Sequence, residues 1–307
     1  MSTRAAVPAT GHEPIVTDSR VVAHFGLAAG QTPENIALEG DGSADLTFAL
    51  ARQVAHVTPD GKTRILATLP SVAQPDTPLL HSAAVTGIVR THDGTLYVNY
   101  ATGTQETGIW RIPGDGGTPV QIAELPPRGL PNGLALDERN GVLYAADSVQ
   151  GIVWRVPTSG GTATAWAQGT ELQPLSASGY GVNGIKVHRD AVWVSNTDRG
   201  SLLRFPVGPD RSAGSVQTRA TGLDGIDDFA FPGNGSSVLA ALNRSSEIVL
   251  VRRDGTHTVV LTPDDGLSNP TSVAVRGRTL YLPSAAFVTR QDPNLVLARL
   301  RYLFGRL

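Results

Sequence analysis

The chain has 307 residues, and its 25 Lys and Arg residues against 27 Asp and Glu residues give a formal net charge of −2. This balance, without any run of basic residues, excludes the electrostatic signature of a nucleic-acid-binding protein. Cysteine is absent, which excludes disulfides, cysteine-ligated zinc and thiol catalysis. No apolar stretch approaches the roughly 18 residues that a membrane span requires, and the first residues contain no apolar run of signal-peptide length. We therefore expect a soluble, cytoplasmic protein with no nucleic-acid or membrane partner.

The predicted elements are short β-strands along the whole chain. After an expected N-terminal arm, residues 1–19, the first strand-like segment is Arg20–Phe25. Alternating apolar runs then recur between Gly, Asp, Asn and Pro residues: Asp45–Leu50, Thr95–Tyr100, Val142–Ala146, Ala191–Ser195, Ser237–Ala241 and Thr279–Leu282. The 34 glycines and 21 prolines indicate frequent turns. This pattern is typical of an all-β protein, and the last stretch, Asn294–Leu307, is either a helix or a final strand.

A repeat runs through the whole chain. Six segments share a polar residue followed by a strand, a turn and a second strand, and they begin PENIALEG, VTGIVRTHDG, PNGLALDERNG, VNGIKVHRD, IDDFAFPGNG and PTSVAVRGR. Their second residues are Glu34, Thr86, Asn132, Asn183, Asp227 and Thr271, which are 52, 46, 51, 44 and 44 residues apart. These spacings are close to the roughly 40–50 residues of a four-stranded propeller blade. We therefore predict a six-bladed β-propeller.

The sixth repeat lacks an outer strand, because little chain remains after Leu297–Tyr302. We expect Arg20–Phe25 to complete the last blade and so close the ring; a loose N-terminal arm is the alternative. Residues 20–307 would then form a single propeller domain.

The inner strand of every blade lines the central channel of a propeller, so residues at one register of the repeat meet in a ring. The six second residues of the repeats all carry a side-chain oxygen. Carboxylate and amide oxygens suit Ca²⁺ or Mg²⁺ better than zinc or copper, and the two carboxylates, Glu34 and Asp227, match one divalent cation in charge. Without a cation they would repel, and one of them would retain a proton.

Each of these residues also has a simpler interpretation. Asn132 and Asn183 stand in Asn-Gly pairs, which are common in turns. Asp227 could begin a strand-entry turn, and Glu34 could be a solvated loop residue. The agreement in register across four repeats favours a metal site over these alternatives.

The pattern resembles the regucalcin, gluconolactonase and luciferin-regenerating-enzyme family of six-bladed propellers and, more distantly, the paraoxonases. The resemblance covers roughly residues 20–300 and rests on Glu in the first blade, Asn in Pro-Asn-Gly, a second Asn one blade later and Asp in the next. It implies that Glu34, Asn132, Asn183 and Asp227 bind one divalent cation. Ca²⁺ is the first choice, with Mg²⁺ or Zn²⁺ as alternatives. Asp228 takes the place of the amide in the acid–amide pair of the paraoxonases.

Two departures from the family pattern concern the substrate. The gluconolactonase branch has an Arg two residues before the first channel Asn, where this chain has Leu130. The paraoxonase branch has a His at the channel position of the second blade, where this chain has Thr86. A substrate more apolar than an aldonolactone is therefore favoured.

The resemblance implies a metal-dependent hydrolase of a lactone or an ester. In this hypothesis the cation polarises the substrate carbonyl and lowers the pKa of a bound water. Asp227 is the expected catalytic general base. Glu34 mainly anchors the metal, and the two asparagines add neutral oxygens.

The substrate is expected to contact loops at the same face. The longest loop without a strand pattern, Thr170–Tyr180, has the size of a lid or binding loop. Three of the candidates have structural alternatives: Tyr180 could pack on the top of its blade, His81 could be structural, and Arg128 could cap its loop. The expected substrate-binding residues are Thr86, Tyr180, His81, Arg128, Asp228 and Thr271.

Two other functions stay open. The same cation could serve a cyclase, lyase or isomerase of secondary metabolism. The protein could also be a non-catalytic propeller that binds a protein partner, since the fold alone does not decide function. The sequence leaves the substrate, the metal and the oligomeric state open.

Overall fold

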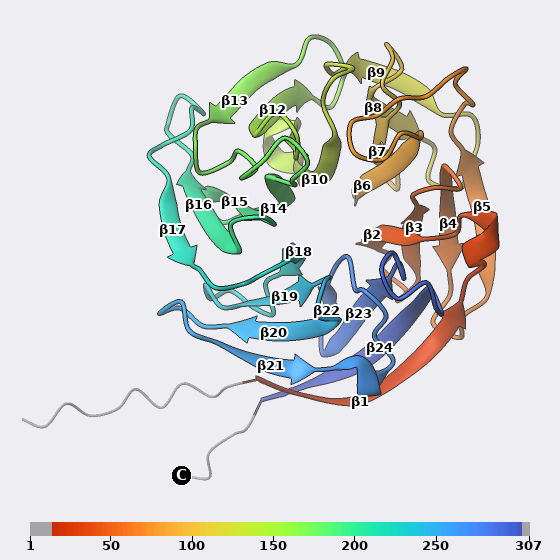
Figure 1. The fold of residues 1–307 in the computed structure, drawn as a ribbon, viewed down its shortest axis with the longest axis vertical. Helices are drawn as coiled ribbons and strands as arrows, with labels where there is room; N and C mark the ends of the chain where they lie inside the picture. The colour runs from red at the N-terminus through yellow and green to blue at the C-terminus, as the bar shows by residue number, and fades with distance from the viewer. Residues whose placement is uncertain (1–13, 303–307) are drawn as a thin grey trace, which may run out of the picture.

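Six four-stranded antiparallel sheets form a closed ring of blades (Figure 1), so the predicted six-bladed β-propeller is confirmed. The computed structural model describes residues 14–302. Each blade runs from an inner strand at the channel to an outer strand at the rim. No helix among the described residues has the length and apolar character needed to cross a bilayer.

The strands follow one another outward in blades 1–5. Blade 1 contains β2 (Pro33–Leu38), β3 (Ala44–Phe48), β4 (Gln53–Val57) and β5 (Thr63–Thr68), and blade 2 contains β6 (Ala84–Arg90), β7 (Leu96–Ala101), β8 (Gly108–Ile112) and β9 (Val120–Glu124). Blade 3 contains β10 (Pro131–Asp137), β11 (Val142–Asp147), β12 (Ile152–Pro157) and β13 (Thr164–Gln168), and blade 4 contains β14 (Val182–His188), β15 (Ala191–Asn196), β16 (Ser201–Pro206) and β17 (Gln217–Ala220). Blade 5 contains β18 (Ile226–Ala230), β19 (Val238–Leu242), β20 (Glu247–Val251) and β21 (His257–Leu261). Short 3₁₀ turns lie in three connections, η1 (Leu27–Ala29), η2 (Glu138–Asn140) and η3 (Pro263–Asp265).

Blade 6 combines the two ends of the described chain. It contains β22 (Ala274–Arg276), β23 (Thr279–Ser284), β24 (Asn294–Tyr302) and, outermost, β1 (Pro14–His24). The pairing of β1 with β24 confirms that an N-terminal strand closes the ring. β1 begins at Pro14, so it includes residues 14–19 of the predicted arm; residues 1–13 lie outside the described part. The last stretch forms a strand and not a helix over Asn294–Tyr302.

The hydrophobic core is divided among the blade interfaces. Among the described residues, six clusters of buried apolar side chains each join two neighbouring blades. Trp110 packs between blades 1 and 2, and Trp193 packs between blades 4 and 5. Because each blade buries both faces against its neighbours, the channel is the place where the inner strands can present polar side chains without breaking the core.

Candidate metal centre

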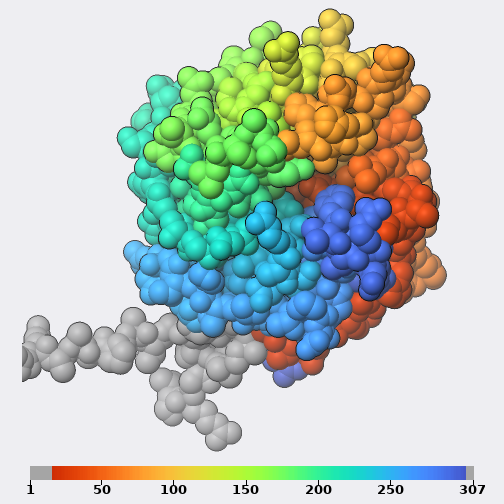
Figure 2. Space-filling model, in the orientation of Figure 1, coloured from red at the N-terminus to blue at the C-terminus, as the bar shows by residue number. Residues whose placement is uncertain are grey.

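Five of the six predicted ring residues line one cavity of about 360 Å³ at the centre of the propeller. They are Glu34, Thr86, Asn132, Asn183 and Asp227. Each lies near the start of an inner strand. Figure 2 shows the surface hollowed near the middle of the ring, with the dark blue loop after β23 at its edge. The volume falls within the range of small-molecule sites, which is roughly 300–1,000 Å³.

A β-bulge presents each of these residues to the channel. In blade 1, Pro33 pairs with Phe48 and Ile36 pairs with Leu46, so two residues, Glu34 and Asn35, stand against one on the partner strand. The same shift in register occurs in blades 2–5. A bulge bends the strand and redirects a side chain. The repeat therefore places a polar residue where the backbone has left the regular ladder.

Polar side chains of one blade hold the ring positions of the next. The hydroxyl of Thr47 donates a hydrogen bond of 2.6 Å to the carbonyl oxygen of Thr86. The amide of Asn99 donates a hydrogen bond of 2.8 Å to the carbonyl oxygen of Asn132. The hydroxyl of Ser195 donates one of 2.5 Å to the backbone carbonyl oxygen of Asp227. These donors are buried, which makes them costly to leave unpaired and so fixes the spacing of the ring.

The residue after each ring position decides how closely neighbouring inner strands approach. It is Gly133 in blade 3 and Gly184 in blade 4. A Cβ atom at Gly133 would lie 2.3 Å from the carbonyl oxygen of Asn183, and one at Gly184 would lie 2.6 Å from Cα of Asp228. The inner strands of blades 3, 4 and 5 therefore meet at a distance that only glycine permits.

In blades 1, 5 and 6 the same position is Asn35, Asp228 and Ser272, and these side chains form a second polar layer. Oδ2 of Asp228 accepts hydrogen bonds from Asn35 Nδ2 at 3.2 Å, Ser272 Oγ at 2.8 Å and Lys186 Nζ at 2.5 Å. Oδ1 of Asp228 is buried and has no hydrogen-bond partner among the described residues. The predicted substrate residue Asp228 therefore lies in this layer and does not line the cavity.

Glu34 and Asp227 are buried carboxyl groups, and few hydrogen bonds and no opposite charge among the described residues offset the cost of burying them. Burial, and next the charge of Asp228, raises the pKa of Glu34 to about 8. Burial, followed by the charges of Glu34 and Asp228, raises the pKa of Asp227 well above its usual range, although hydrogen bonds from Asn183 and Asn243 lower it. Oε2 of Glu34 is buried without a partner in the described part of the chain. Taking a charge out of water without pairing it is costly, so this pair of carboxylates favours a positive ligand.

The two asparagines complete a set of oxygen donors. The Nδ2 of Asn183 donates a hydrogen bond of 3.0 Å to the hydroxyl of Thr197, which leaves its carbonyl oxygen for another contact. Asn132 is buried and lines the same cavity. Carboxylate and amide oxygens are the ligands of hard cations such as Ca²⁺ and Mg²⁺. Together with the unpartnered oxygen of Glu34, they fit a divalent cation.

Two of the predicted substrate residues lie at the cavity. Thr86 lines it, and its hydroxyl donates a hydrogen bond of 2.8 Å to the carbonyl oxygen of Pro131. Tyr180 also lines it, and burial, followed by the charges of Glu34 and Asp227, raises the pKa of this phenol to about 12. Tyr180 is therefore a neutral hydroxyl group beside the carboxylates.

Three other predicted residues lie outside the cavity lining, as Asp228 does. Thr271 is fully buried, and its hydroxyl ties blade 6 to blade 1 through the carbonyl oxygen of Pro33 at 2.9 Å. The exposed His81 bonds Asp76 at 2.8 Å. Arg128 is exposed.

Several residues of the site carry no obvious signal in the repeat. Asn243 donates a hydrogen bond of 3.3 Å to Oδ2 of Asp227, and Arg244 lines the cavity beside it. Both follow β19, and Thr197 holds the matching position after β15. Ala49 holds it after β3, so in blades 1, 4 and 5 the residue that follows the second strand is a second position that lines the cavity.

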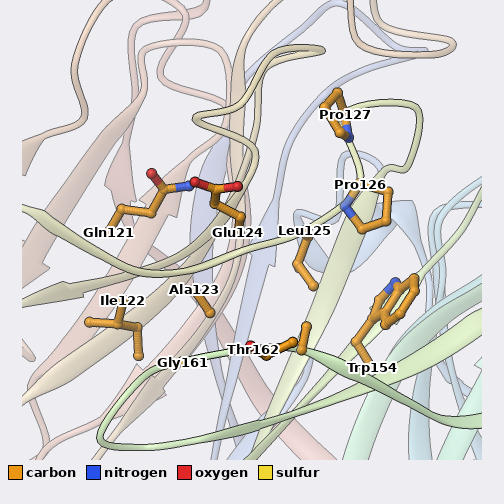
Figure 3. Close-up of a pocket in the computed structure, with 11 residues that line it drawn as sticks. Gln121, Ile122, Ala123, Glu124, Leu125, Pro126, Pro127, Trp154, Gly161 and Thr162 are labelled. Carbon is orange, nitrogen blue, oxygen red and sulfur yellow. The ribbon is translucent and has the colours of Figure 1, made fainter.

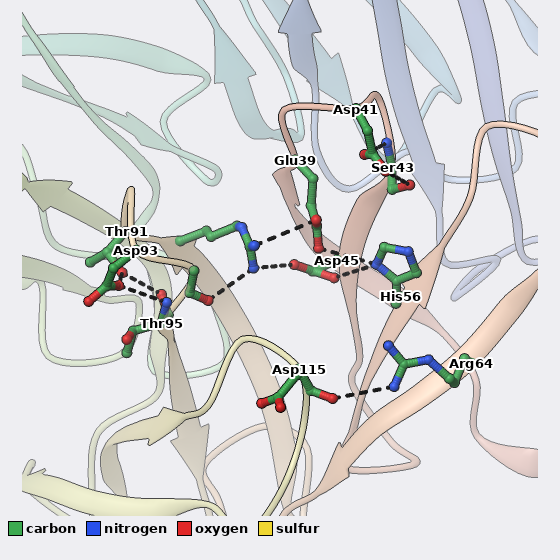
Figure 4. A network of polar contacts seen from close by, with 12 residues as sticks. Glu39, Asp41, Ser43, Asp45, His56, Arg64, Thr91, Asp93, Thr95 and Asp115 are labelled. Atoms are coloured by element: carbon green, nitrogen blue, oxygen red, sulfur yellow. Dashed lines mark hydrogen bonds and ion pairs between the residues drawn. The ribbon is translucent and has the colours of Figure 1, made fainter.

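A group of acidic and histidine side chains lies at the other end of β2. Ligand atoms of Glu39, Asp45 and His56 lie within 4.8 Å of one another, and Figure 4 shows them converging. His56 Nδ1 is 3.2 Å from Asp45 and 3.3 Å from Glu39, and the guanidinium of Arg90 is 3.5 Å from each carboxylate. Burial, followed by the charge of Glu39, raises the pKa of Asp45 to about 6. The group could hold a cation, but a guanidinium already faces both of its carboxylates.

A larger cavity of about 650 Å³ lies at the rim between blades 2 and 3 (Figure 3). Its lining comes from β9, from Trp154 on β12 and from the turn before β13. Glu124 is the only titratable side chain among the lining residues. This cavity therefore offers no acid–base pair and no ligand set, and the chemistry of the described residues concentrates in the channel.

No family model and no curated protein sequence matches the chain. Solved structures do match. The calcium-binding protein regucalcin from Agrobacterium tumefaciens is 16% identical with a TM-score of 0.67, over 95% of this chain and 97% of its own. A gluconolactonase from Xanthomonas campestris is 17% identical with a TM-score of 0.63, over 97% and 99%. At the level of the fold, these structures confirm the resemblance found in the sequence.

The same fold also occurs in a virginiamycin B lyase from Staphylococcus aureus, which is 15% identical with a TM-score of 0.58, over 94% of this chain and 100% of the lyase. At such identities the likeness shows the fold alone. Because proteins with different activities share this fold, the reaction depends on the channel residues and not on the fold.

Proposed function

We propose that this protein hydrolyses a lactone or an ester at the channel cavity, with one divalent cation held by Glu34, Asn132, Asn183 and Asp227. The observation that carries the proposal is the meeting of two buried, poorly compensated carboxylates with amide oxygens at the floor of an open cavity of about 360 Å³. Perturbed carboxyl groups in a cleft are typical of functional sites. Gluconolactonase activity in a protein of the same fold adds support.

When bound, the cation supplies a Lewis acid that stabilises the negative charge developing on the carbonyl oxygen. Asp227 accepts a proton from the attacking water as the water oxygen bonds to the carbonyl carbon. Asn243 orients this carboxylate through the hydrogen bond to Oδ2. Breaking the bond between the carbonyl carbon and the leaving oxygen then returns the proton from Asp227 to that oxygen. The products are the acid and the alcohol, which are one hydroxy acid when the substrate is a lactone.

The test is hydrolysis of an aryl acetate and of a series of lactones by chelator-treated protein, with and without added Ca²⁺ or Mg²⁺. We expect turnover to require the cation and Asp227→Asn to lower kcat by about 100-fold or more, the usual contribution of a general base. Glu34→Gln should also lose activity. Glu39→Gln, which alters the other acidic group, is the matched control and should stay active. Full activity of Asp227→Asn would remove that residue as the base, and full activity in chelator would remove the cation.

A lyase is the second candidate, because a virginiamycin B lyase has the same fold. In an elimination, Asp227 would take a proton from carbon instead of from water. The products of the two reactions differ in mass, since hydrolysis adds one water to the substrate and elimination adds none. Mass spectrometry of the product therefore separates them.

A further inference from the structure

The channel cavity has an apolar side. Leu50 from the β3–β4 turn, Leu80 before β6, and Phe287 and Val288 from the loop after β23 all line it. Leu50 is 40% exposed and Val288 is 66% exposed. Large apolar side chains from three separate loops that gather at one cavity mouth indicate contact with an apolar ligand.

The cavity also has a basic side. Arg244, from the β19–β20 turn, is the only Lys, Arg or His among the described residues that line it. Its guanidinium makes no hydrogen bond or ion pair with another residue in the described part of the chain. An arginine at a cavity mouth offers planar, bidentate donors that match a carboxylate.

Asn269 fixes these two sides relative to each other. This side chain is 1% exposed and donates a hydrogen bond of 2.9 Å from Nδ2 to the carbonyl oxygen of Asn243, next to Arg244. Its Oδ1 accepts hydrogen bonds from the backbone N–H groups of Val288 at 2.9 Å and Thr289 at 2.8 Å. One buried amide therefore braces both the arginine turn and the apolar loop, so the two halves of the mouth are pre-organised.

The charges of the floor decide where an anionic group can lie. Glu34 and Asp227 lie at the bottom of the cavity, and the described residues that line it there include no basic side chain, so the floor offers an anion no positive partner. Arg244 attracts one at the mouth. A ligand with an apolar body and an anionic end therefore has one favourable orientation, with its anionic end at Arg244 and its apolar body against Leu50, Leu80 and Val288.

We propose that the cavity selects amphipathic substrates, namely lactones or esters whose aliphatic or aromatic body carries a remote carboxylate, and that Arg244 binds this carboxylate. This inference rests on the proposed hydrolase function for the identity of the reacting group. The anion subsite itself is a property of the mouth and is testable by binding alone. Arg244 is then a specificity-determining residue, and it touches the substrate at a distance from the reacting carbonyl.

The test compares two probes of the same shape, 4-phenylbutyrate and the uncharged 4-phenylbutanol, by titration calorimetry on chelator-treated protein. Removing metal ions prevents the carboxylate from binding a channel cation. We expect the wild type to bind the acid about tenfold or more tightly than the alcohol, as a charge-assisted contact predicts. Arg244→Met should abolish this preference, and Arg244→Lys should retain part of it.

Two further variants complete the design. Val288→Ser, an exposed position, should weaken both probes alike. Arg139→Met, an exposed arginine on η2, should leave both affinities unchanged. Equal affinity of the wild type for the two probes, failure to bind either, or a preference that survives in Arg244→Met would each overturn the proposal.

Kinetics separates this proposal from the hydrolase assignment. If esters are hydrolysed, Arg244→Met should raise KM for a carboxylated ester and leave KM for its uncharged counterpart unchanged. Equal affinity of the wild type for the two probes, with intact hydrolysis, would overturn the anion subsite alone. Intact discrimination without any hydrolysis would overturn the hydrolase and leave the subsite standing.

Discussion

The ammonium nitrogen of Lys186 lies 2.5 Å from Oδ2 of Asp228, in the polar layer beside the channel carboxylates. Asp228 is fully buried, and the side chain of Lys186 is 28% exposed. The lysine therefore supplies a built-in positive charge for one of the three carboxylates at the centre of the propeller. Neither Glu34 nor Asp227 has such a partner in the described part of the chain, which is why a bound cation is expected beside them and not beside Asp228.

Replacing Lys186 with Met should destabilise the protein, because it leaves the charge of Asp228 buried and unpaired. Removing one partner of a buried ion pair costs about 3–5 kcal/mol, and the partial exposure of Lys186 places the expected loss toward the lower end. Urea unfolding measures this loss in the free energy of unfolding. The matched control is Lys62→Met, which removes the only other lysine from an exposed pair with Asp60 and should change stability by less than about 1 kcal/mol. Equal effects of the two variants would contradict a special role for Lys186.

Addition of Ca²⁺ to chelator-treated protein should raise the melting temperature. A ligand of the native state at about 100 times its Kd stabilises by about 2.7 kcal/mol. Glu34→Gln should lose the response, and Glu39→Gln should retain it. The reverse result would place the cation in the group of Glu39, Asp45 and His56. Parallel additions of Mg²⁺ and Zn²⁺ identify which ion the site prefers.

The metal-free protein should lose stability as pH rises. Burial and the charge of Asp228 raise the pKa of Glu34 from 4.5 to about 8, so the folded state keeps this proton at pH values where the unfolded chain has released it. The resulting stability is present below about pH 4.5 and is lost as pH approaches about 8, at up to about 1.4 kcal/mol per pH unit. Urea unfolding of chelated protein between pH 5 and 8 measures the slope. Glu34→Gln should reduce the slope and leave the part that the raised pKa of Asp227 contributes, and an unchanged slope would contradict the assignment.

The closing strand should be needed for stability. Val21 on β1 packs against the cluster between blades 5 and 6, and the neighbouring Arg20 is exposed. Val21→Asp buries a charged group and should lower the free energy of unfolding by about 1–3 kcal/mol or more. Arg20→Asp is the control and should have little effect. Deletion of residues 1–27, which removes all of β1, should lower the melting temperature further; an unchanged melting temperature would show that the ring closes without it.

The ring of polar residues was predictable because each member occupies the same register of a repeat. Glu34, Asn132 and Asp227 needed no contact information, since six copies of one supersecondary unit place equivalent residues around one axis. The start of β1 was not predictable in the same way. Asp18 has a positive φ of 56° within a register shift between Thr17 and Arg20, and this irregularity interrupts the alternation on which strand prediction depends.

The residues that sequence reasoning missed act across blades. Lys186 reaches from blade 4 to Asp228 on blade 5, and Arg244 enters the cavity from a turn whose direction depends on the buried Asn269. The prediction of His81 and Arg128 rests on their nearness in sequence to the channel loops. Nearness along a loop does not determine the direction of a side chain, which is set by tertiary contacts such as the bond between His81 and Asp76.

Gly133→Ala should test whether the close approach of the inner strands builds the metal site. Its Cβ atom would lie 2.3 Å from the carbonyl oxygen of Asn183 and 3.1 Å from Cα of Gly184. Both contacts are with backbone atoms, so blades 3 and 4 must move apart. We expect a loss of about 1–3 kcal/mol in stability, as overpacking predicts, together with a weaker Ca²⁺ response, because Asn132 and Asn183 would separate. Gly233→Ala is the matched control, since nothing lies within 4 Å of its added Cβ atom. If Gly133→Ala is destabilised but responds to Ca²⁺ as the wild type does, the two asparagines are not both ligands, and the cation must then depend on the carboxylates alone.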